Sequence, residues 1–434
     1  MTASTTEPVP RTPRRLRRGV LRALVAFGLL LATAGCTVPG AGTEERVSIM
    51  VPWTQKAEFQ AFYSVVKDFE HDTGVRVDVQ VTRALTQQLD ASVAAGSPPD
   101  LAVLPSVSAI ARYTHKGKGL RPLDDDTVDI DAYLQPFRGL AQVRGTTYAV
   151  PVKVDVKTLV WYDSETTEQP PTDSIDALAA FARGADLRWC LGLASGPTSG
   201  WPGADWIADI MLADAGAGAY AQWASGTLPW TSTEVERAWS RWRGLLGDAA
   251  LRDAPQKAFS DATRTMTTPS PTCQLAHGTR SALAAVDGEP ARLDFVAPPT
   301  NRPVQVSGDF IGMFTADNPS ARRFVAYLAG SEGQQSWGNA PGSSAFSAHA
   351  AVTGYANPVQ QRIATMLQPR SGYQLCFSAA DVLSPDVAAA FYRAVLDFAD
   401  GANDLGSLLP QLQSVQEELG TSPLPANALC AAPP

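Results

Sequence analysis

The sequence VSIMV, residues 47–51, begins a segment in which apolar runs and amphipathic stretches alternate up to residue 104. Apolar residues then recur every three or four positions, as on one face of a helix that ends at Gly74: Phe59, Phe62, Tyr63, Val66 and Phe69. Alternating valines in VRVDVQV, residues 75–81, predict a half-buried strand. A second helical face at 85–93 and a short buried strand at 101–104 follow. This alternation of strands and helices favours an α/β sheet.

A second informative stretch is CLGLASGPTSGWPGADW, residues 190–206, where an apolar run ends in a loop rich in glycine and proline. We expect Trp201 to lie on this irregular loop and Asp205 to lie in the first turn of the helix that follows. An aromatic ring beside a carboxylate suits a sugar, because the ring packs on C–H faces and the carboxylate accepts hydroxyl hydrogen bonds. The alternative is structural: a buried Trp and an Asp that stabilises a helix N-terminus. Taken alone, these residues favour the structural alternative.

The chain has 434 residues, of which 45% are hydrophobic and 18% charged, so it can bury a sizeable core in two lobes. Residues 1–35 contain six Arg and one Glu, so their removal takes the formal charge from −8 to −13. An acidic mature chain argues against a nucleic-acid partner.

The N-terminus has the pattern of a signal peptide, which is excluded from the fold. Six arginines precede the apolar run Ala23–Ala34, whose twelve residues are too few for a membrane span of about 20. Ala34-Gly35-Cys36 then resembles a lipobox, although Thr33 stands where Leu is usual. We expect a signal peptide at 1–35, a lipid on Cys36 and a tether at 36–46, with the protein on the extracytoplasmic face of the cell membrane. The arginine-rich start leaves the general and twin-arginine export routes open.

Four further cysteines remain after Cys36: Cys190, Cys273, Cys376 and Cys430. An even number in an exported chain predicts two disulfides, and four cysteines allow three connectivities. A metal site is the weaker alternative, because no Cys-x-x-Cys spacing occurs.

Local catalytic signatures are absent from the sequence. There is no phosphate-binding Gly-x-x-x-x-Gly-Lys-[Ser/Thr] loop and no Gly-x-Ser-x-Gly nucleophile motif, and the four histidines are scattered. A Ser-His-Asp site or a carboxylate pair assembled from distant positions remains open. We therefore expect no enzyme activity, no cofactor and no metal.

Several stretches, taken in order, resemble the family 1 extracellular solute-binding proteins, the sugar-binding lipoproteins of ABC importers. The similarity is greatest to actinobacterial α-glucoside-type members. It is carried by residues 96–100 (GSPPD), 148–162 (YAVPVKVDVKTLVWY), 189–190 (WC), 200–206 (GWPGADW) and 307–310 (SGDF).

The resemblance implies a two-lobed α/β fold of the periplasmic-binding-protein class, maltose-binding-protein type, with a hinge and an interlobe cleft. One lobe would comprise residues 47–152 and 303–348. The other would comprise residues 153–302 and 349–430. Ligand would bind in the cleft and drive a hinge closure.

Ligand contacts are also implied by the resemblance. Trp201 and Asp205 correspond to cleft residues of the second lobe, and Asp309 and Phe310 to cleft residues of the first. Trp53 follows the first strand, where relatives often present a ligand contact.

Two more implied ligand residues are Lys153, in the hinge tract, and Asp381. The tract around Asp381 departs from the family pattern, because Cys376 and Ser378 stand where relatives often carry an Arg and an extra Asp. The implied lobes also select one disulfide connectivity. Cys190 pairs with Cys273 in the second lobe, and Cys376 pairs with Cys430 near the C-terminus.

The function that this resemblance implies is capture of a carbohydrate, an oligosaccharide or α-glucoside, by a monomeric lipoprotein that delivers it to the permease subunits of an ABC importer. One alternative is a secreted glycosidase, which needs two carboxylates facing one cleft. Another is a binding protein of the same fold for a different solute. An anion would call for a cleft lined by Arg and Lys, and the Trp- and Asp-containing loops argue against it.

Overall fold

The computed structural model describes residues 45–104, 106–114, 119–283, 286, 290–297, 302–420, 424 and 426–433. The expected signal peptide, the lipidation residue Cys36 and the tether up to residue 44 lie outside the described residues. Within the described part of the chain, no helix combines the length and apolar character that a membrane crossing requires.

The larger of the described sheets has the strand order β11-β10-β3-β1-β2, with β6 paired to β10. Its strands are β1 (Arg46–Val51), β2 (Arg76–Val81), β3 (Leu101–Val103), β6 (Ala149–Val156), β10 (Pro303–Met313) and β11 (Gln374–Phe377). Strand β1 runs parallel to β2 and β3, with helices α2 (Lys56–Thr73) and α3 (Leu85–Ala94) as the connections. The strand–helix alternation predicted for residues 47–104 is therefore confirmed.

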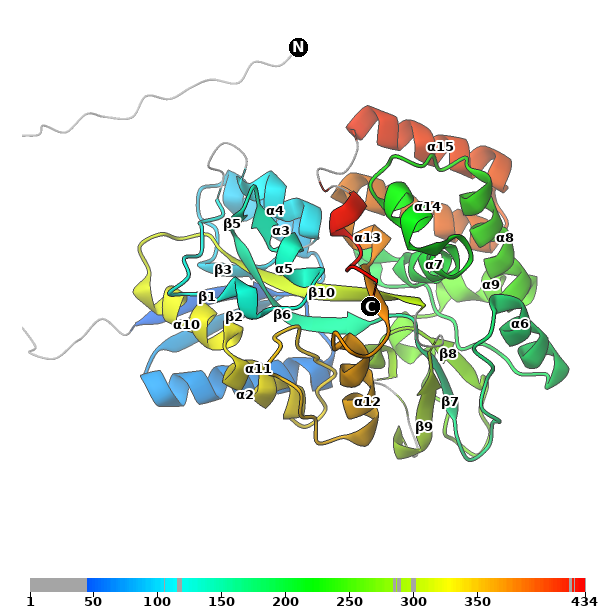
Figure 1. The fold of residues 1–434 in the computed structure, drawn as a ribbon, viewed down its shortest axis with the longest axis horizontal. Helices are drawn as coiled ribbons and strands as arrows, with labels where there is room; N and C mark the ends of the chain where they lie inside the picture. Colours follow the sequence, from blue (N-terminus) through cyan, green and yellow to red (C-terminus); the bar gives the residue numbers. More distant parts are fainter. Residues whose placement is uncertain are drawn as a thin grey trace, which may run out of the picture. The chain divides into compact units, whose positions relative to one another are not determined.

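Helices lie on both sides of these strands, as an α/β sheet requires. Figure 1 shows α2, α10 and α11 along one side of β1 and β2, and α3 and α4 along the other. The additional elements of this region are α4 (Val107–Thr114), α5 (Phe137–Leu140), β4 (Gln142–Val143), β5 (Thr146–Thr147), α10 (Pro319–Ala329), α11 (Ser331–Asn339) and α12 (Pro358–Leu367).

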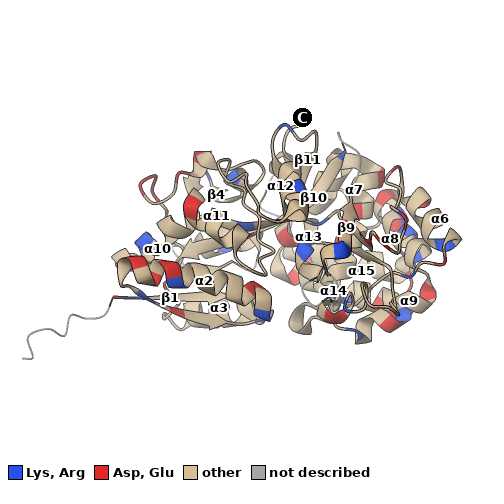
Figure 2. Ribbon diagram, turned by 90° about the horizontal axis from the view of Figure 1, so that it is seen from below, with Lys and Arg blue, Asp and Glu red and all other residues tan. Residues whose placement is uncertain are grey.

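A smaller antiparallel sheet is formed by β7 (Val160–Asp163) between β8 (Leu275–His277) and β9 (Leu293–Val296). The helices drawn on the same side of Figure 1 are α6 (Ile175–Gly184), α7 (Trp201–Ala224), α8 (Thr233–Leu246), α9 (Asp248–Asp253), α13 (Ala379–Val382), α14 (Pro385–Asp400) and α15 (Leu405–Leu419). Figure 2 shows acidic and basic residues interspersed along outer helices such as α2, α6, α8 and α9.

Strands β6 and β10 connect these two groups of elements. They pair antiparallel, and one end of β10 also pairs with β3 while its other end pairs with β11. Figure 1 shows both strands crossing the middle of the described fold. Every residue of β6 is buried, so this strand pair has packed neighbours on both faces.

Two aromatic clusters mark the core on either side of the crossing strands. Trp53, Phe62 and Trp337 pack with ring centroids 4.7–5.2 Å apart. In the other cluster the ring of Phe391 on α14 lies 4.9 Å from that of Trp230 and 5.8 Å from that of Trp239 on α8. Such ring pairs bury large apolar areas, and both clusters belong to one continuous hydrophobic core.

Both predicted disulfides are present: Cys190–Cys273 and Cys376–Cys430. The first joins the segment before the glycine-rich loop to the chain just before β8. The second joins β11 to the C-terminal segment, whose backbone also pairs with β11 through Phe377 N–H to the Leu429 carbonyl. The two bridges therefore close chain segments of 83 and 54 residues.

Removal of either disulfide is expected to lower the free energy of unfolding by about 2–4 kcal/mol, because the unfolded chain regains loop entropy. We predict this loss for Cys190→Ser/Cys273→Ser and for Cys376→Ser/Cys430→Ser, with each pair removed while the other is kept. The two losses should differ by only a few tenths of a kcal/mol, since closure entropy rises slowly with loop length. Denaturant titration gives the energies. Peptide mapping without reductant checks the pairing, and a peptide that links Cys190 to Cys376 or Cys430 would contradict it.

Gly200 fixes the start of α7 against α14. Its φ is +104°, and an added Cβ would lie 2.1 Å from the carbonyl oxygen of Tyr392. A side chain there meets both a left-handed backbone conformation and rigid backbone atoms. The close packing of α14 on this loop thus requires glycine at position 200.

Gly200→Ala is expected to lower the free energy of unfolding by about 1–3 kcal/mol, from steric overlap and backbone strain. The matched control is Gly218→Ala on the same helix, where an added Cβ meets nothing within 4 Å. That control should be neutral or stabilising by up to about 1 kcal/mol, because Ala favours helix more than Gly does. Urea unfolding of both variants measures the difference, and equal effects would show that the contact with α14 does not matter.

Candidate functional site

Charged side chains occupy alternate positions along β6 and just beyond its end. Lys153, Asp155 and Lys157 are two residues apart, and successive side chains of a strand point to opposite faces, so these three share one face. On β10, Asp309 lies opposite Lys153 and Ser307 lies opposite Asp155. The pairing of the two crossing strands thus collects five polar side chains on one surface.

Lys153 is buried, with 5% exposure, and is shared by three carboxylates. Its Nζ lies 2.7 Å from Glu58 Oε1, 3.3 Å from Asp155 Oδ2 and 3.8 Å from Asp309 Oδ2. Burial disfavours the ammonium form, but the charges of Asp155, Glu58 and Asp309 outweigh it and raise the pKa of Lys153 well above its ordinary value. Lys153 therefore remains a cation that holds these carboxylates together.

Lys157 forms a second cluster further along the same face. Its Nζ lies 2.8 Å from Asp205 Oδ1, 3.3 Å from Asp381 Oδ2 and 3.2 Å from Ser378 Oγ. Burial opposes its charge, but Asp205 and Asp381 overcome that cost and raise the pKa of Lys157. The sequence analysis did not select Lys157, although its even spacing from Lys153 was a usable signal.

Helix α7 begins at Trp201, earlier than the sequence analysis expected. Trp201 is therefore the first helical residue instead of a loop residue, and Asp205 lies one turn further along. Residues four apart share a helix face, so both side chains face Lys157, whose Nζ is 5.9 Å from the centroid of the Trp201 ring. Asp205 thus pairs with a lysine, and its predicted place in the first turn is corrected. The Trp201 ring also packs edge-on against Phe259, with centroids 5.1 Å apart.

A cavity of about 210 Å³ lies over the two lysines. Four of the predicted ligand residues line it: Lys153, Trp201, Asp309 and Asp381. They come from β6, α7, β10 and α13, which are far apart in the sequence. Asp155 and Lys157 also line the cavity, although the sequence analysis did not select them.

The remaining three predicted residues lie elsewhere. Asp205 lines a neighbouring cavity of about 30 Å³ that shares Trp201 with the larger one. Trp53 is buried in the aromatic cluster, and its Nε1 donates a 2.8 Å hydrogen bond to Asp309 Oδ2, so it positions that carboxylate. Phe310 follows Asp309 on β10, points to the opposite face and is buried 6.0 Å from Phe377.

Two buried carboxylate oxygens at this site have no hydrogen-bond partner among the described residues: Asp155 Oδ1 and Asp205 Oδ2. Burial raises the pKa of Asp155 to about 6, with Asp309 and Glu58 adding to the effect and Lys153 opposing it. Burial likewise raises the pKa of Asp205 to about 6, against the attraction of Lys157. Buried acceptors are nearly always satisfied in proteins, so these two oxygens are exceptions that mark the carboxylates of Asp155 and Asp205 as incompletely bonded.

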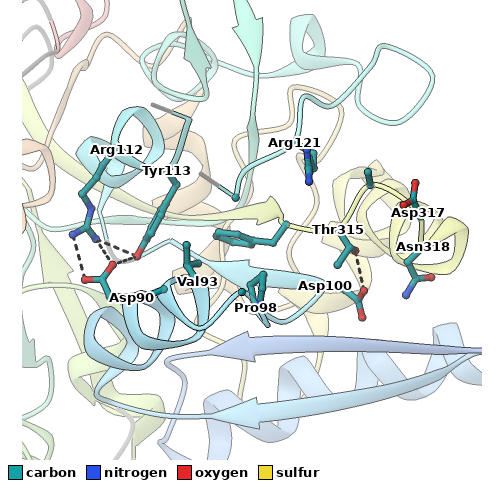
Figure 3. Close-up of a pocket in the computed structure, with 15 residues that line it drawn as sticks. Asp90, Val93, Pro98, Asp100, Arg112, Tyr113, Arg121, Thr315, Asp317 and Asn318 are labelled. Atoms are coloured by element: carbon teal, nitrogen blue, oxygen red, sulfur yellow. Dashed lines mark hydrogen bonds and ion pairs between the residues drawn. The ribbon is translucent and has the colours of Figure 1, made fainter. Parts of the chain in front are cut away.

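A larger pocket, of about 1090 Å³, lies where the chain enters β3 and leaves β10 (Figure 3). Two of its carboxylates are bonded to neighbouring side chains. Asp100 accepts hydrogen bonds from Thr315 and from Ser48, and Asp90 binds Arg112 and Tyr113. None of the predicted ligand residues lines it. We therefore place the candidate site at the smaller cavity over the lysines.

Among the described residues, no group of three or more His, Cys, Asp or Glu side chains is placed to hold a metal ion. The carboxylates at the cavity are instead bonded to lysine or tryptophan donors. This arrangement can accept hydrogen bonds from a polar ligand and can pack an aromatic ring against it.

Comparison with known proteins identifies the family. A family model described as bacterial extracellular solute-binding protein matches residues 64–359. The alpha-glucosides-binding periplasmic protein AglE of Rhizobium meliloti is 29% identical over 389 residues, which are 82% of this chain and 84% of that protein. The osmoprotective compounds-binding protein GgtB of Synechocystis is 30% identical over 331 residues, 70% of this chain and 77% of that protein.

The fold also matches a solved structure. A chitin oligosaccharide binding protein superposes with a TM-score of 0.71 over 87% of this chain and 99% of that chain, at 18% sequence identity. At that identity the likeness concerns the fold alone, and it agrees with the two-lobed α/β architecture implied by the sequence. The family match covers more than half of the chain, and the chain belongs to the bacterial extracellular solute-binding protein family.

Proposed function

We propose that this protein is a non-catalytic receptor that captures a carbohydrate, an oligosaccharide or α-glucoside, and delivers it to the permease subunits of an ABC importer. One observation carries the proposal: Trp201, Asp309 and Asp381, from three distant parts of the chain, line one cavity. The indole ring offers a flat apolar surface for the C–H face of a sugar ring. The carboxylates accept the hydrogen bonds of its hydroxyl groups.

The relatives support a sugar ligand. AglE is named for α-glucosides, and the structural neighbour is named for chitin oligosaccharides. GgtB is named for osmoprotective compounds, which broadens the ligand class to small polar solutes. The relatives of known name are binding proteins, in keeping with a receptor that does not transform its ligand.

We also propose that the cavity lies between two lobes, residues 47–152 with 303–348 and residues 153–302 with 349–430. Asp309 belongs to the first and Trp201 and Asp381 to the second, so one ligand would contact both. The boundary at Lys153 falls within β6, which pairs with β10 along the crossing strands. Bending of this strand pair would close the lobes over the ligand, because few other segments cross between them.

The proposal extends to the N-terminus. Residues 1–35 would be removed on export, and a lipid on Cys36 would hold a monomeric receptor at the extracytoplasmic face of the membrane. A single lipidated residue before a short tether keeps the cleft within reach of the permease. The Ala34-Gly35-Cys36 sequence supports this part of the proposal.

We predict that Trp201→Ala and Asp309→Asn each weaken carbohydrate binding by about ten- to hundredfold. That range corresponds to the loss of one charged hydrogen bond or one ring contact, about 1.5–3 kcal/mol. Melting temperatures should change little, because the amide oxygen introduced by Asp309→Asn can still accept the hydrogen bond from Trp53, and Trp201 lies at the edge of the core. A thermal-shift screen against mono-, di- and oligosaccharides finds the ligand, since binding to the folded state raises apparent stability. Calorimetric titration then measures the affinities.

Control variants distinguish the loss of a ligand contact from a loss of fold stability. Trp201→Phe keeps an aromatic face and should lose less affinity than Trp201→Ala. Asp176→Asn removes an exposed carboxylate on α6 and should bind as the parent does. If Trp201→Ala and Asp309→Asn both bind like the parent, the proposed site is wrong.

Cys36→Ser is predicted to move the protein from the membrane fraction to the soluble extracellular fraction, because the thioether-linked lipid can no longer form. Fractionation of cells followed by immunoblotting measures the distribution. A variant that stays fully membrane-bound would rule out a lipid anchor at this residue. Cys273→Ser serves as the cysteine control and should remain with the membrane.

A further inference from the structure

The charges at the proposed sugar site do not balance. Two lysines, Lys153 and Lys157, contact five carboxylates: Glu58, Asp155, Asp205, Asp309 and Asp381. With all groups ionised the cluster carries three negative charges in excess. Among the described residues that line the cavity, no arginine and no third lysine supplies the missing positive charge. The side chains of Asp309 and Asp381 are 31% and 30% exposed, so solvent offsets part of this charge, whereas those of Glu58, Asp155 and Asp205 are largely buried. A buried charge without a partner is costly.

Of the five carboxylates, Asp155 has the weakest contacts with donors and positive charges. Its side chain lines the cavity, and the residue is 8% exposed. Its Oδ2 lies 3.3 Å from Lys153 Nζ. The same Nζ lies closer to Glu58 Oε1, at 2.7 Å. Oδ1 has no hydrogen-bond partner among the described residues. A carboxylate that lines a binding cavity and has a single ion pair, at 3.3 Å, indicates a donor that the ligand brings.

We infer that the ligand carries a protonated amino group on a sugar, and that the carboxylate of Asp155, which lines the cavity, receives this ammonium. The inference rests on the proposed carbohydrate function and narrows its ligand to amino sugars. An ammonium provides three donors and one positive charge, whereas a hydroxyl provides one donor and no charge. Only the ammonium reduces the negative excess around Lys153 and Lys157. Ser307, opposite Asp155 on β10, adds a hydroxyl that lines the same cavity.

The test compares sugars that differ only at one substituent. Full-length protein purified in detergent is titrated by calorimetry at about pH 7 with glucose, glucosamine and N-acetylglucosamine, and with the galactose equivalents. Diglucosamine, diacetylchitobiose, maltose and trehalose extend the panel to two rings. We expect an aminated sugar to bind at least about tenfold more tightly than its neutral and acetylated counterparts, as for a charged hydrogen bond.

A variant identifies the receiving residue. Asp155→Asn should reduce the ratio of affinities for the aminated and the neutral sugar to near one. The variant should fold, because Lys153 keeps Glu58 and Asp309 as partners. Asp176→Asn removes the same charge from the surface of α6 and should keep the full preference. The comparison of ligands on the unchanged protein stands even if Asp155→Asn fails to fold.

The preference should also depend on pH. Glu58, Lys153 and Asp309 face Asp155, and burial raises the pKa of Asp155 to about 6. Lowering the pH from about 7 to about 5 therefore protonates this carboxylate, and the preference for the ammonium should fall toward one. Asp155→Asn should show a smaller decline over the same range.

The possible results are distinguishable. If neutral sugars bind as tightly as aminated ones, the amino-sugar inference is overturned and the carbohydrate function stands. If Asp155→Asn folds and still binds the aminated sugar as selectively as the parent does, Asp155 does not receive the ammonium, and that part of the inference is overturned. If no sugar of the panel binds, the proposed carbohydrate function fails and the inference falls with it.

Discussion

The antiparallel pairing of β6 with β10 is the constraint on which the site depends. It sets Asp309 opposite Lys153 and Ser307 opposite Asp155, and it places Lys157 just beyond the end of β6. A one-residue slip of β10 along β6 would turn Asp309 and Ser307 away from Lys153 and Asp155. Strand β10 also pairs with β3 at one end and β11 at the other, so the register joins the two groups of helices as well.

The two buried lysines link this strand pair to its surroundings. Lys153 reaches Glu58 on α2, and Lys157 reaches Asp205 on α7 and Asp381 on α13. Buried ion pairs contribute little net stability, because desolvation offsets much of the attraction. They do fix geometry, since each lysine has one arrangement that satisfies its partners.

The tract that departs from the family pattern has a structural explanation here. Cys376, on β11, is bonded to Cys430, and Ser378 contributes a neutral hydroxyl to Lys157. A carboxylate in place of Ser378 would add another negative charge to a cluster that already has an excess. The chain therefore uses position 378 for a hydrogen bond and position 376 for a covalent link to its C-terminus.

Several features were determined by the sequence alone. The strand–helix order of residues 47–104 and the disulfide partners followed from local periodicity, cysteine number and family resemblance. The resemblance also selected Trp201, Asp309 and Asp381 as ligand residues, which stays a prediction, and the three line one cavity. Periodicity reports which face of an element is apolar, and these signals are local. The tertiary structure decided which polar groups meet. Asp155 and Lys157 share the even spacing of Lys153, but only the tertiary structure shows that this face of β6 meets α7, α13 and β10. Trp53 and Phe310 are buried because packing, which depends on distant helices, closes over them.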